Sequence, residues 1–247
     1  MPSPQPTSPA RRPARWRQAL WFAALLVAGC GGGGSAQADA PPATGAHAWV
    51  VVGSSTAAGA GATAGQGWVA LMAAEEAPRG VVVHNLARPS LTSYHVLSAG
   101  SQPPPGRPAP DPSADVDAAL ALHPQALFVS LPTNDTAMGY SVSETVTNLL
   151  AIRSQALQAG VPVVMLSTQP RDLPPDRLAL LPQIDQQLAD AAGPCFVPVR
   201  AQLAGPDGRI DPRYDVGDGV HLNDAGHQVV WQQVRAVLQS HACIASG

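Results

Sequence analysis

Four residues near the C-terminus, Asp218, His221, Asp224 and His227, are of types that do acid–base chemistry and lie close together in the stretch VGDGVHLNDAGHQVVWQQV. A carboxylate that accepts a hydrogen bond from a histidine ring fixes the ring's tautomer, and the ring can then take a proton from a nucleophile. Asp218 and His221 are three positions apart in a glycine-containing segment, so a local turn can pair them. We therefore expect an Asp–His pair whose third partner comes from elsewhere in the chain.

Serine is a poor nucleophile unless such a base removes its proton. Ser55, in the segment GSST directly after an apolar run, is the natural candidate, because a hydroxyl at a strand-to-helix turn projects from the edge of a sheet. A reaction at a carbonyl also needs hydrogen-bond donors for the oxyanion, and the side-chain amide of Asn134 offers one after a neighbouring strand. These residues together predict acyl transfer.

Short β-rich runs alternate with longer helical patterns from Ala48 onward, which is typical of parallel βαβ units. The expected strands are 48–53, 80–85, 126–131, 161–167 and 196–199. The expected helices are 67–77, a helix that begins at a capping box of Ser141 and Glu144 and ends at Gly160, 176–192, and a last helix capped by Asn223 or Asp224 that reaches about Leu238. Residues 101–114 are too rich in proline to form a strand. The pattern predicts an α/β fold, a three-layer α/β/α sandwich with a mostly parallel central sheet, whose sites lie at the carboxyl ends of the strands.

Two other kinds of site, a dinucleotide site and a metal site, fit the sequence less well. The run GAGATA, 59–64, nearly spells a dinucleotide-binding motif, but it begins several residues past the first strand and lacks the acidic residue that the motif needs about twenty positions later. Small residues there are expected instead to let the loop behind Ser55 pack tightly. A metal site of Asp218, His221 and His227 would need a further ligand, and none is conspicuous. We expect no metal and no cofactor, and we expect His227 to be a partly packed helix residue.

Four segments in order resemble the motif blocks of the SGNH (GDSL-type) hydrolases: a Gly-Asp-Ser turn, an Asn–Gly segment, a Gly-x-Asn-Asp segment and an Asp-x-x-His segment. The matching segments are GSST with Ser55, NLARPS with Asn85 and Ser90, PTND with Asn134 and Asp135, and DGVH with Asp218 and His221. Three positions depart from the blocks: Ser54 stands for an aspartate, and Ser90 and Pro132 each stand for a glycine.

The resemblance implies a serine esterase that works through an acyl-enzyme. Ser55 would be the nucleophile, His221 the base and Asp218 the residue that orients it. The oxyanion hole would consist of the N–H groups of Ser55 and Ser90 with the amide of Asn134. The three departures leave an alternative open, a carbohydrate- or ligand-binding module that keeps the fold without the chemistry.

The N-terminus is expected to direct export. An arginine-rich start is followed by an apolar run too short to span a bilayer and by Val-Ala-Gly-Cys, which resembles a bacterial lipobox with Cys30 as the lipidated residue. The alternative is an ordinary signal peptide with a chance cysteine. We predict a signal peptide at 1–30, a flexible tether at 31–46 and a hydrolase domain at 47–247. The protein would lie in the cell envelope and touch the membrane only through its lipid.

The charge and the aromatic content of the chain limit the kinds of molecule it can be expected to bind. After the leader the chain holds 10 arginines and no lysine against 17 acidic residues, which argues against a nucleic-acid partner. With only three Phe and three Tyr, a large aromatic acyl pocket has little support, so we expect a small-molecule or glycan ester with a short acyl group such as acetyl.

For Arg171 and for the two cysteines after the leader, the sequence leaves two alternatives each. Arg171 follows the fourth expected strand; a solvent-exposed side chain is favoured, with substrate contact as the alternative. Cys195 and Cys243 either pair or remain separate thiols.

Overall fold

The computed structural model describes residues 47–131 and 133–244. The predicted signal peptide, the tether, Cys30 and Pro132 lie outside the described residues, so the predictions about them remain predictions. Within the described part of the chain, no helix is long and apolar enough to cross a bilayer.

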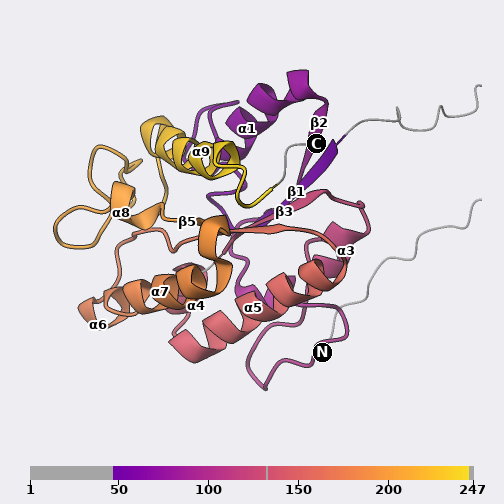
Figure 1. The fold of residues 1–247 in the computed structure, drawn as a ribbon. Helices are drawn as coiled ribbons and strands as arrows, with labels where there is room; N and C mark the ends of the chain where they lie inside the picture. The colour runs from indigo at the N-terminus through magenta and orange to yellow at the C-terminus, as the bar shows by residue number, and fades with distance from the viewer. Residues whose placement is uncertain (1–46, 132, 245–247) are drawn as a thin grey trace, which may run out of the picture. The chain divides into compact units, whose positions relative to one another are not determined.

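A five-stranded sheet forms the centre of the domain (Figure 1). Its strands are β1 (His47–Gly53), β2 (Val81–Asn85), β3 (Ala126–Ser130), β4 (Val163–Leu166) and β5 (Phe196–Val197). Their order is β2-β1-β3-β4-β5, and every neighbouring pair is parallel. Because both faces of a parallel sheet are covered, its strands are apolar almost throughout, and every residue of β4 is buried. The predicted α/β fold is confirmed.

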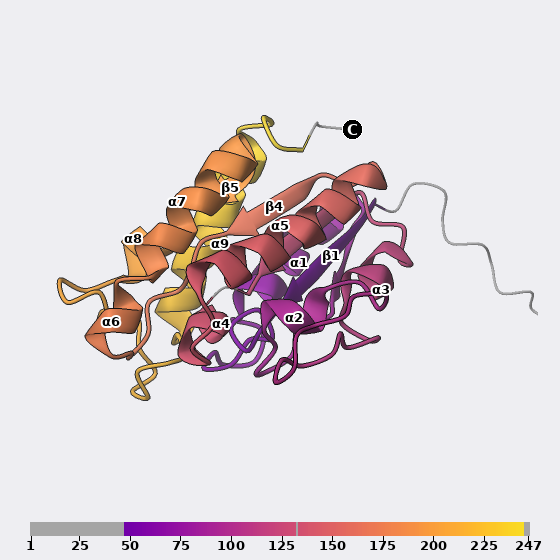
Figure 2. The same ribbon diagram turned by 90° about the horizontal axis from the view of Figure 1, so that it is seen from below.

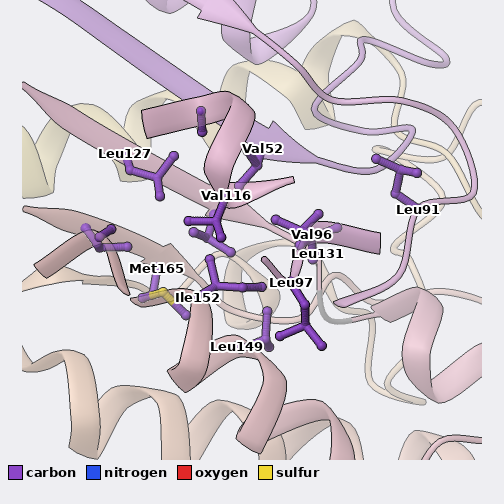
Figure 3. Packing of buried hydrophobic residues seen from close by; sticks show 14 of the residues in the cluster. Val52, Leu91, Val96, Leu97, Val116, Leu127, Leu131, Leu149, Ile152 and Met165 are labelled. Carbon is purple, nitrogen blue, oxygen red and sulfur yellow. The ribbon is translucent and has the colours of Figure 1, made fainter. Parts of the chain in front are cut away.

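Helices cover both faces of the sheet (Figure 2). They are α1 (Trp68–Glu76), α2 (Ser93–Val96), α3 (Val116–Leu120), α4 (Thr133–Ala137), α5 (Val142–Gln158), α6 (Pro175–Leu178), α7 (Leu181–Ala192), α8 (Arg200–Leu203) and α9 (Asp224–Gln239), with 3₁₀ turns at Ala77–Arg79 and Gly193–Cys195. The core on one face joins α2, α3, α5 and α7 to the sheet (Figure 3). The core on the other face joins α1, α8 and α9 to it and contains Trp68 and Trp231.

Local sequence signals account for the ends of several helices. Ser141 and Glu144 form the predicted capping box of α5, and Gly160 follows that helix with φ of 78°. Asn223 caps α9 by accepting a hydrogen bond from the N–H of Gly226. Helix caps depend only on neighbouring residues, so they can be predicted from the sequence without knowledge of the fold.

The prediction of a single helix at 176–192 is wrong. It is divided into α6 and α7, and Pro182 stands in the first turn of α7. A proline ring clashes with the carbonyl four residues earlier, so a continuous helix through Leu178 is blocked, whereas the first turn of a new helix accepts proline. The short helices α2, α3, α4 and α8 were not predicted, and β5 is shorter than the expected strand 196–199.

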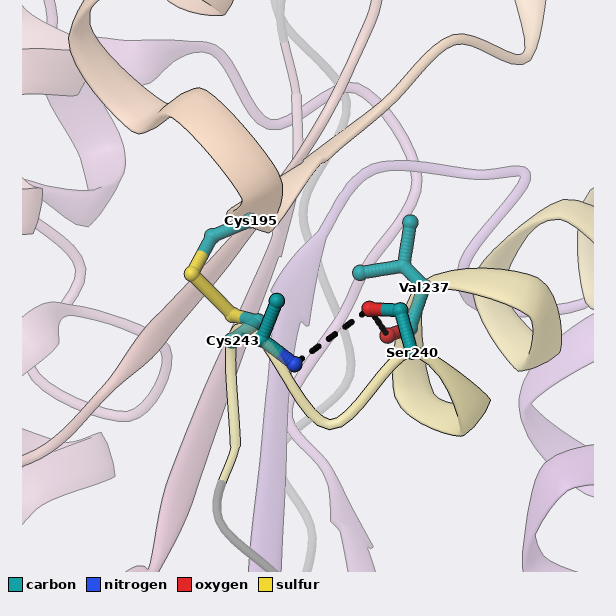
Figure 4. The surroundings of a disulfide bond; sticks show 5 residues. Cys195, Val237, Ser240 and Cys243 are labelled. Atoms are coloured by element: carbon teal, nitrogen blue, oxygen red, sulfur yellow. Dashed lines mark hydrogen bonds between the residues drawn. A yellow bond between two sulfur atoms is a disulfide. The ribbon is translucent and has the colours of Figure 1, made fainter.

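A disulfide joins Cys195, just before β5, to Cys243 in the tail after α9 (Figure 4). The two Cα atoms are 4.8 Å apart, and 48 positions separate the residues in sequence. The bond therefore closes a loop that contains β5, α8 and the whole of α9. Of the two alternatives that the sequence left open, the structure contains the paired form.

We expect the double variant Cys195→Ser/Cys243→Ser to unfold more easily, because a loop of this length contributes up to about 4 kcal/mol by restricting the unfolded chain. Urea unfolding of the oxidised protein and the variant should show a lower midpoint for the variant, with an equal or larger dependence of the unfolding free energy on urea concentration. The wild type with reductant is the matched control and should shift in the same direction. An unchanged midpoint in both would mean that the bond contributes nothing.

Candidate active site

Ser55 lies in the turn that leaves β1 at the carboxyl edge of the sheet. The turn packs against the end of β3, because the N–H of Ser54 donates to the carbonyl of Ser130 at 3.1 Å. Gly53 permits this approach: a Cβ there would come within 2.5 Å of the Ala57 Cβ and 2.9 Å of the Ser130 oxygen. The sequence thus fixes the backbone that carries the serine hydroxyl.

The structure brings the three predicted residues together. The Nε2 atom of His221 lies 3.1 Å from the hydroxyl oxygen of Ser55, and its Nδ1 lies 2.6 Å from Oδ2 of Asp218. A carboxylate can only accept, so Nδ1 carries the ring proton in the neutral imidazole and Nε2 is left as the acceptor that faces the serine. The arrangement is that of a hydroxyl, a base and a residue that orients the base.

Asp218 is held by the backbone of its own loop. Its Oδ1 accepts hydrogen bonds from the N–H groups of Val220 and His221, both at 2.8 Å. Although partial burial opposes ionisation, the His221 ring and these two N–H groups lower the pKa of Asp218 to about 2. The carboxylate is therefore ionised at every pH at which the histidine can act as a base.

The loop that presents His221 meets the loop that follows Ser55 at Gly61. A Cβ on Gly61 would lie 2.3 Å from the carbonyl oxygen of Leu222 and 3.1 Å from the Cβ of His221. Asp224 adds a second link, since it accepts hydrogen bonds from the N–H and hydroxyl of Thr63 at 2.7 and 2.8 Å. The small residues at 59–64 do let this loop pack tightly, as expected from the sequence.

Asn134, in the first turn of α4, has its side-chain amide held at both ends. Its Nδ2 donates to the carbonyl of Leu91 at 2.9 Å, and its Oδ1 accepts from Nη1 of Arg171 at 3.1 Å. The amide nitrogen has two hydrogens, so one N–H remains for another acceptor. The orientation of this amide is therefore set by its neighbours.

Ser90 stands one residue before Leu91 in the left-handed region, with φ of 68°. This conformation explains why the family block has glycine there, since a side chain is disfavoured at such an angle. The N–H groups of Ser55 and Ser90 find no hydrogen-bond acceptor in the described part of the chain. Ser90 is, however, not among the described residues that line the hollow beside Ser55.

Two further residues of the matched blocks brace the site from behind. Asn85 donates through Nδ2 to the carbonyl of Ala57 at 2.8 Å, behind Ser55. Asp135 is buried and accepts hydrogen bonds from the N–H of Ser93, at 2.9 Å, and from its hydroxyl. Burial raises the pKa of Asp135 to about 7, although these hydrogen bonds favour its ionised form. Asp135 thus ties α4 to α2.

A hollow of about 370 Å³, part of it open to solvent, lies beside Ser55. It is lined mainly by polar side chains from the ends of the strands: Ser54, Ser55, Thr56, Ser130, Leu131, Thr133, Asn134, Ser167, Gln169, Arg171 and Val220. Gln169 was missed in the sequence. Its side chain accepts from the hydroxyl of Thr56 at 2.5 Å and donates to the carbonyl of Val220 at 2.8 Å. The only signal that could have found it was its place after the fourth strand.

Arg171 was expected to be exposed to solvent, and this is wrong. Its side chain is half-buried, lines the hollow and contacts Asn134. Burial lowers the pKa of its guanidinium, while the negative charge of Asp218 acts in the opposite direction. The segment after β4 therefore places this side chain against Asn134.

His227 is fully buried and uses both ring nitrogens. Nε2–H donates to the carbonyl of Ala60 at 3.0 Å, and Nδ1 accepts from the N–H of Trp68 at 3.3 Å. It is therefore not turned toward Asp218 and His221 as a third metal ligand. In residues 47–131 and 133–244, no three His, Cys, Asp or Glu side chains are grouped to hold a metal ion.

Comparisons with known proteins show the family and the fold of the chain. The sequence profile of the GDSL-like lipase/acylhydrolase family matches residues 51–229. A crystal structure of TesA is 25% identical, with a TM-score of 0.59, over 78% of this chain and 99% of that one. The esterase EstA from Pseudoalteromonas sp., inhibited by monoethylphosphonate, is 17% identical with a TM-score of 0.60, over 78% and 97%. A G-D-S-L family protein from Desulfitobacterium hafniense is 13% identical with a TM-score of 0.61, over 77% and 98%.

At these identities, the last two structures show a shared fold. No curated protein matches the sequence significantly. The family profile covers well over half of the chain and includes the segments that carry Ser55, Asn134 and His221. The chain belongs to the GDSL-like lipase/acylhydrolase family.

Proposed function

We propose that this protein is a serine esterase that removes short acyl groups through a covalent acyl-enzyme. The observation that carries the proposal is the line of contacts from the Ser55 hydroxyl through His221 to Asp218. A hydroxyl within hydrogen-bond distance of an oriented imidazole is the arrangement that activates a serine.

In the proposed reaction, Ser55 Oγ bonds to the acyl carbon while its proton passes to Nε2 of His221. The Asp218 carboxylate, ionised at working pH, stabilises the imidazolium. The tetrahedral intermediate then breaks its bond to the alcohol oxygen, which takes the proton from Nε2. Water repeats the two steps on the acyl-enzyme and releases the acid.

The oxyanion would be held by the N–H groups of Ser55 and Ser90 and by the free N–H of Asn134. Their lack of other acceptors in the described chain supports this assignment. Each such donor contributes roughly 3 to 4 kcal/mol to transition-state stabilisation. Ser90 supplies its N–H from the same left-handed conformation that a glycine would adopt.

A short acyl group such as acetyl is favoured by the hollow itself. Most of its lining groups are hydroxyls, amides and a guanidinium, and Leu131 and Val220 are its apolar side chains. A long alkyl chain would leave these polar groups without partners. An ester on a cell-envelope glycan would suit an exported enzyme anchored through Cys30, and both the location and the anchor are part of the proposal.

Ser55→Ala should lower the hydrolysis of p-nitrophenyl acetate by at least about 10⁴-fold, because the variant has no nucleophile. It should also abolish covalent labelling by a fluorophosphonate. Ser54→Ala is the matched control, since it removes the neighbouring hydroxyl and should leave both readouts nearly unchanged. Labelling that persists in Ser55→Ala would assign the nucleophile elsewhere. A wild type that neither labels nor turns over esters would favour the ligand-binding module.

Gly61→Ala should lower kcat for p-nitrophenyl acetate by roughly 10- to 100-fold, because the new methyl group displaces Leu222 and His221, and small misplacements cost this much. Gly65→Ala is the control. Gly65 also has positive φ, at 81°, but open space where the methyl group would lie. Both variants should lose about 1 kcal/mol of stability from backbone strain, and Gly61→Ala should lose more because its methyl group meets the backbone oxygen of Leu222. Equal kcat values in the two variants would contradict the role given to the contact at Gly61.

A series of p-nitrophenyl esters should give its highest kcat/KM at acetate or propionate and fall as the acyl chain lengthens, since only Leu131 and Val220 offer apolar side chains to the added methylenes. The measurement is the initial rate of nitrophenol release against ester concentration at each acyl length. The rate with Ser55→Ala in place of the wild type is subtracted as background. A maximum at eight carbons or more would show that an alkyl-binding surface exists outside this hollow.

A further inference from the structure

Arg171 is the only charged residue among the described residues that line the hollow beside Ser55. It reaches there from the segment after β4, and its Nη1 lies 3.1 Å from Oδ1 of Asn134. The guanidinium therefore stands next to the proposed oxyanion donor. A cation in this place touches whatever ester occupies the hollow.

Arg171 makes no ion pair with a carboxylate among the described residues, although the negative charge of Asp218 lies near it. Seven of the ten arginines in the described chain pair with a carboxylate, and Arg171 does not. The nearby acid is Asp218, and its two oxygens already accept from Val220 N–H and from the backbone and ring of His221. A half-buried guanidinium that makes no ion pair is available to a negatively charged ligand.

The donors of Arg171 are also largely unused. A guanidinium has five N–H groups, and one hydrogen bond, to Asn134, is made by this one. The Nε–H is enclosed without an acceptor, so the Nη end is what faces the hollow. Two Nη groups side by side match the two oxygens of a carboxylate. The domain as a whole is negatively charged and does not attract anions. A preference for an anionic ester would therefore come from the local charge of Arg171.

We propose that Arg171 is a specificity residue that binds a carboxylate carried by the ester substrate close to the scissile bond. The inference rests on the proposed esterase function and deepens it. The carboxylate belongs either to the acyl part or to the alcohol part of the ester, and the two sources are separated by experiment.

Two pairs of shape-matched esters test this in the full-length protein, with acid release followed in a pH-stat. Acetoxyacetate against isobutyl acetate places the charge in the alcohol part; monomethyl succinate against methyl isocaproate places it in the acyl part. In one pair the wild type should prefer the anion, and Arg171→Gln should lower the anionic-to-neutral ratio of kcat/KM by roughly 10- to 100-fold. Arg171→Lys should restore part of the preference, because it keeps the charge without the fork.

Arg177→Gln is the matched control. Arg177 also lacks a carboxylate partner and belongs to the next segment of chain, but it donates to the carbonyl of Ala137 and does not line the hollow. Its loss should leave the ratio unchanged. An equal fall of the ratio in Arg177→Gln would show general steering by charge and overturn the proposal. An equal loss for charged and neutral esters in Arg171→Gln would show that Arg171 acts only by positioning Asn134.

Binding separates this inference from the esterase proposal. Calorimetric titration of Ser55→Ala with acetoxyacetate and with monomethyl succinate should show binding of one of them, and the added Arg171→Gln change should abolish it. Hydrolysis of the neutral esters without any anionic preference or binding would refute the inference alone. Binding at Arg171 without turnover of any ester would refute the esterase and leave the carboxylate site standing.

Discussion

The hydrogen bond between Ser55 and His221 joins residues that are 166 positions apart, and the structure of the site depends on this meeting of the first loop with the last. Neither residue holds the other, because one hydrogen bond of this kind contributes about 1 kcal/mol. The two loops are held instead by contacts beside the reacting groups. Gly61 lies against Leu222, and Asp224 binds Thr63.

His227 adds a further contact between the loop after Ser55 and the C-terminal segment that carries His221. Its ring, buried and neutral, bonds the carbonyl of Ala60 and the N–H of Trp68, so it spans the loop after Ser55 from one end to the other. Burial lowers the pKa of His227, which keeps it neutral and preserves both bonds. Two histidines six positions apart therefore make different contacts. His221 contacts the Ser55 hydroxyl, whereas His227 holds the loop after Ser55 in place.

Much of this could be predicted from the sequence, because the signals are local. Alternating strand and helix patterns gave the order of elements, the Ser141–Glu144 box marked one helix start, and four short segments indicated the residues that meet at the sheet edge. What could not be predicted depends on tertiary contacts. Gln169 and Arg171 have no sequence motif, and the inward direction of Arg171 follows from where the segment after β4 lies in the fold. Pro182 marks the break between α6 and α7, because the first turn of a helix accepts proline and a continuous helix does not.

Helix α9 connects the hollow with the opposite edge of the sheet. It begins just after His221 and runs for 16 residues, about 24 Å, to the tail that is cross-linked at Cys195. Contacts of Asn223 and Asp224 hold the start of α9, and the disulfide ties the tail just after its end. The helix therefore resists tilting, which would move the imidazole of His221 away from Ser55. Oxidation of the two thiols therefore restrains the far end of the helix whose first turn follows His221.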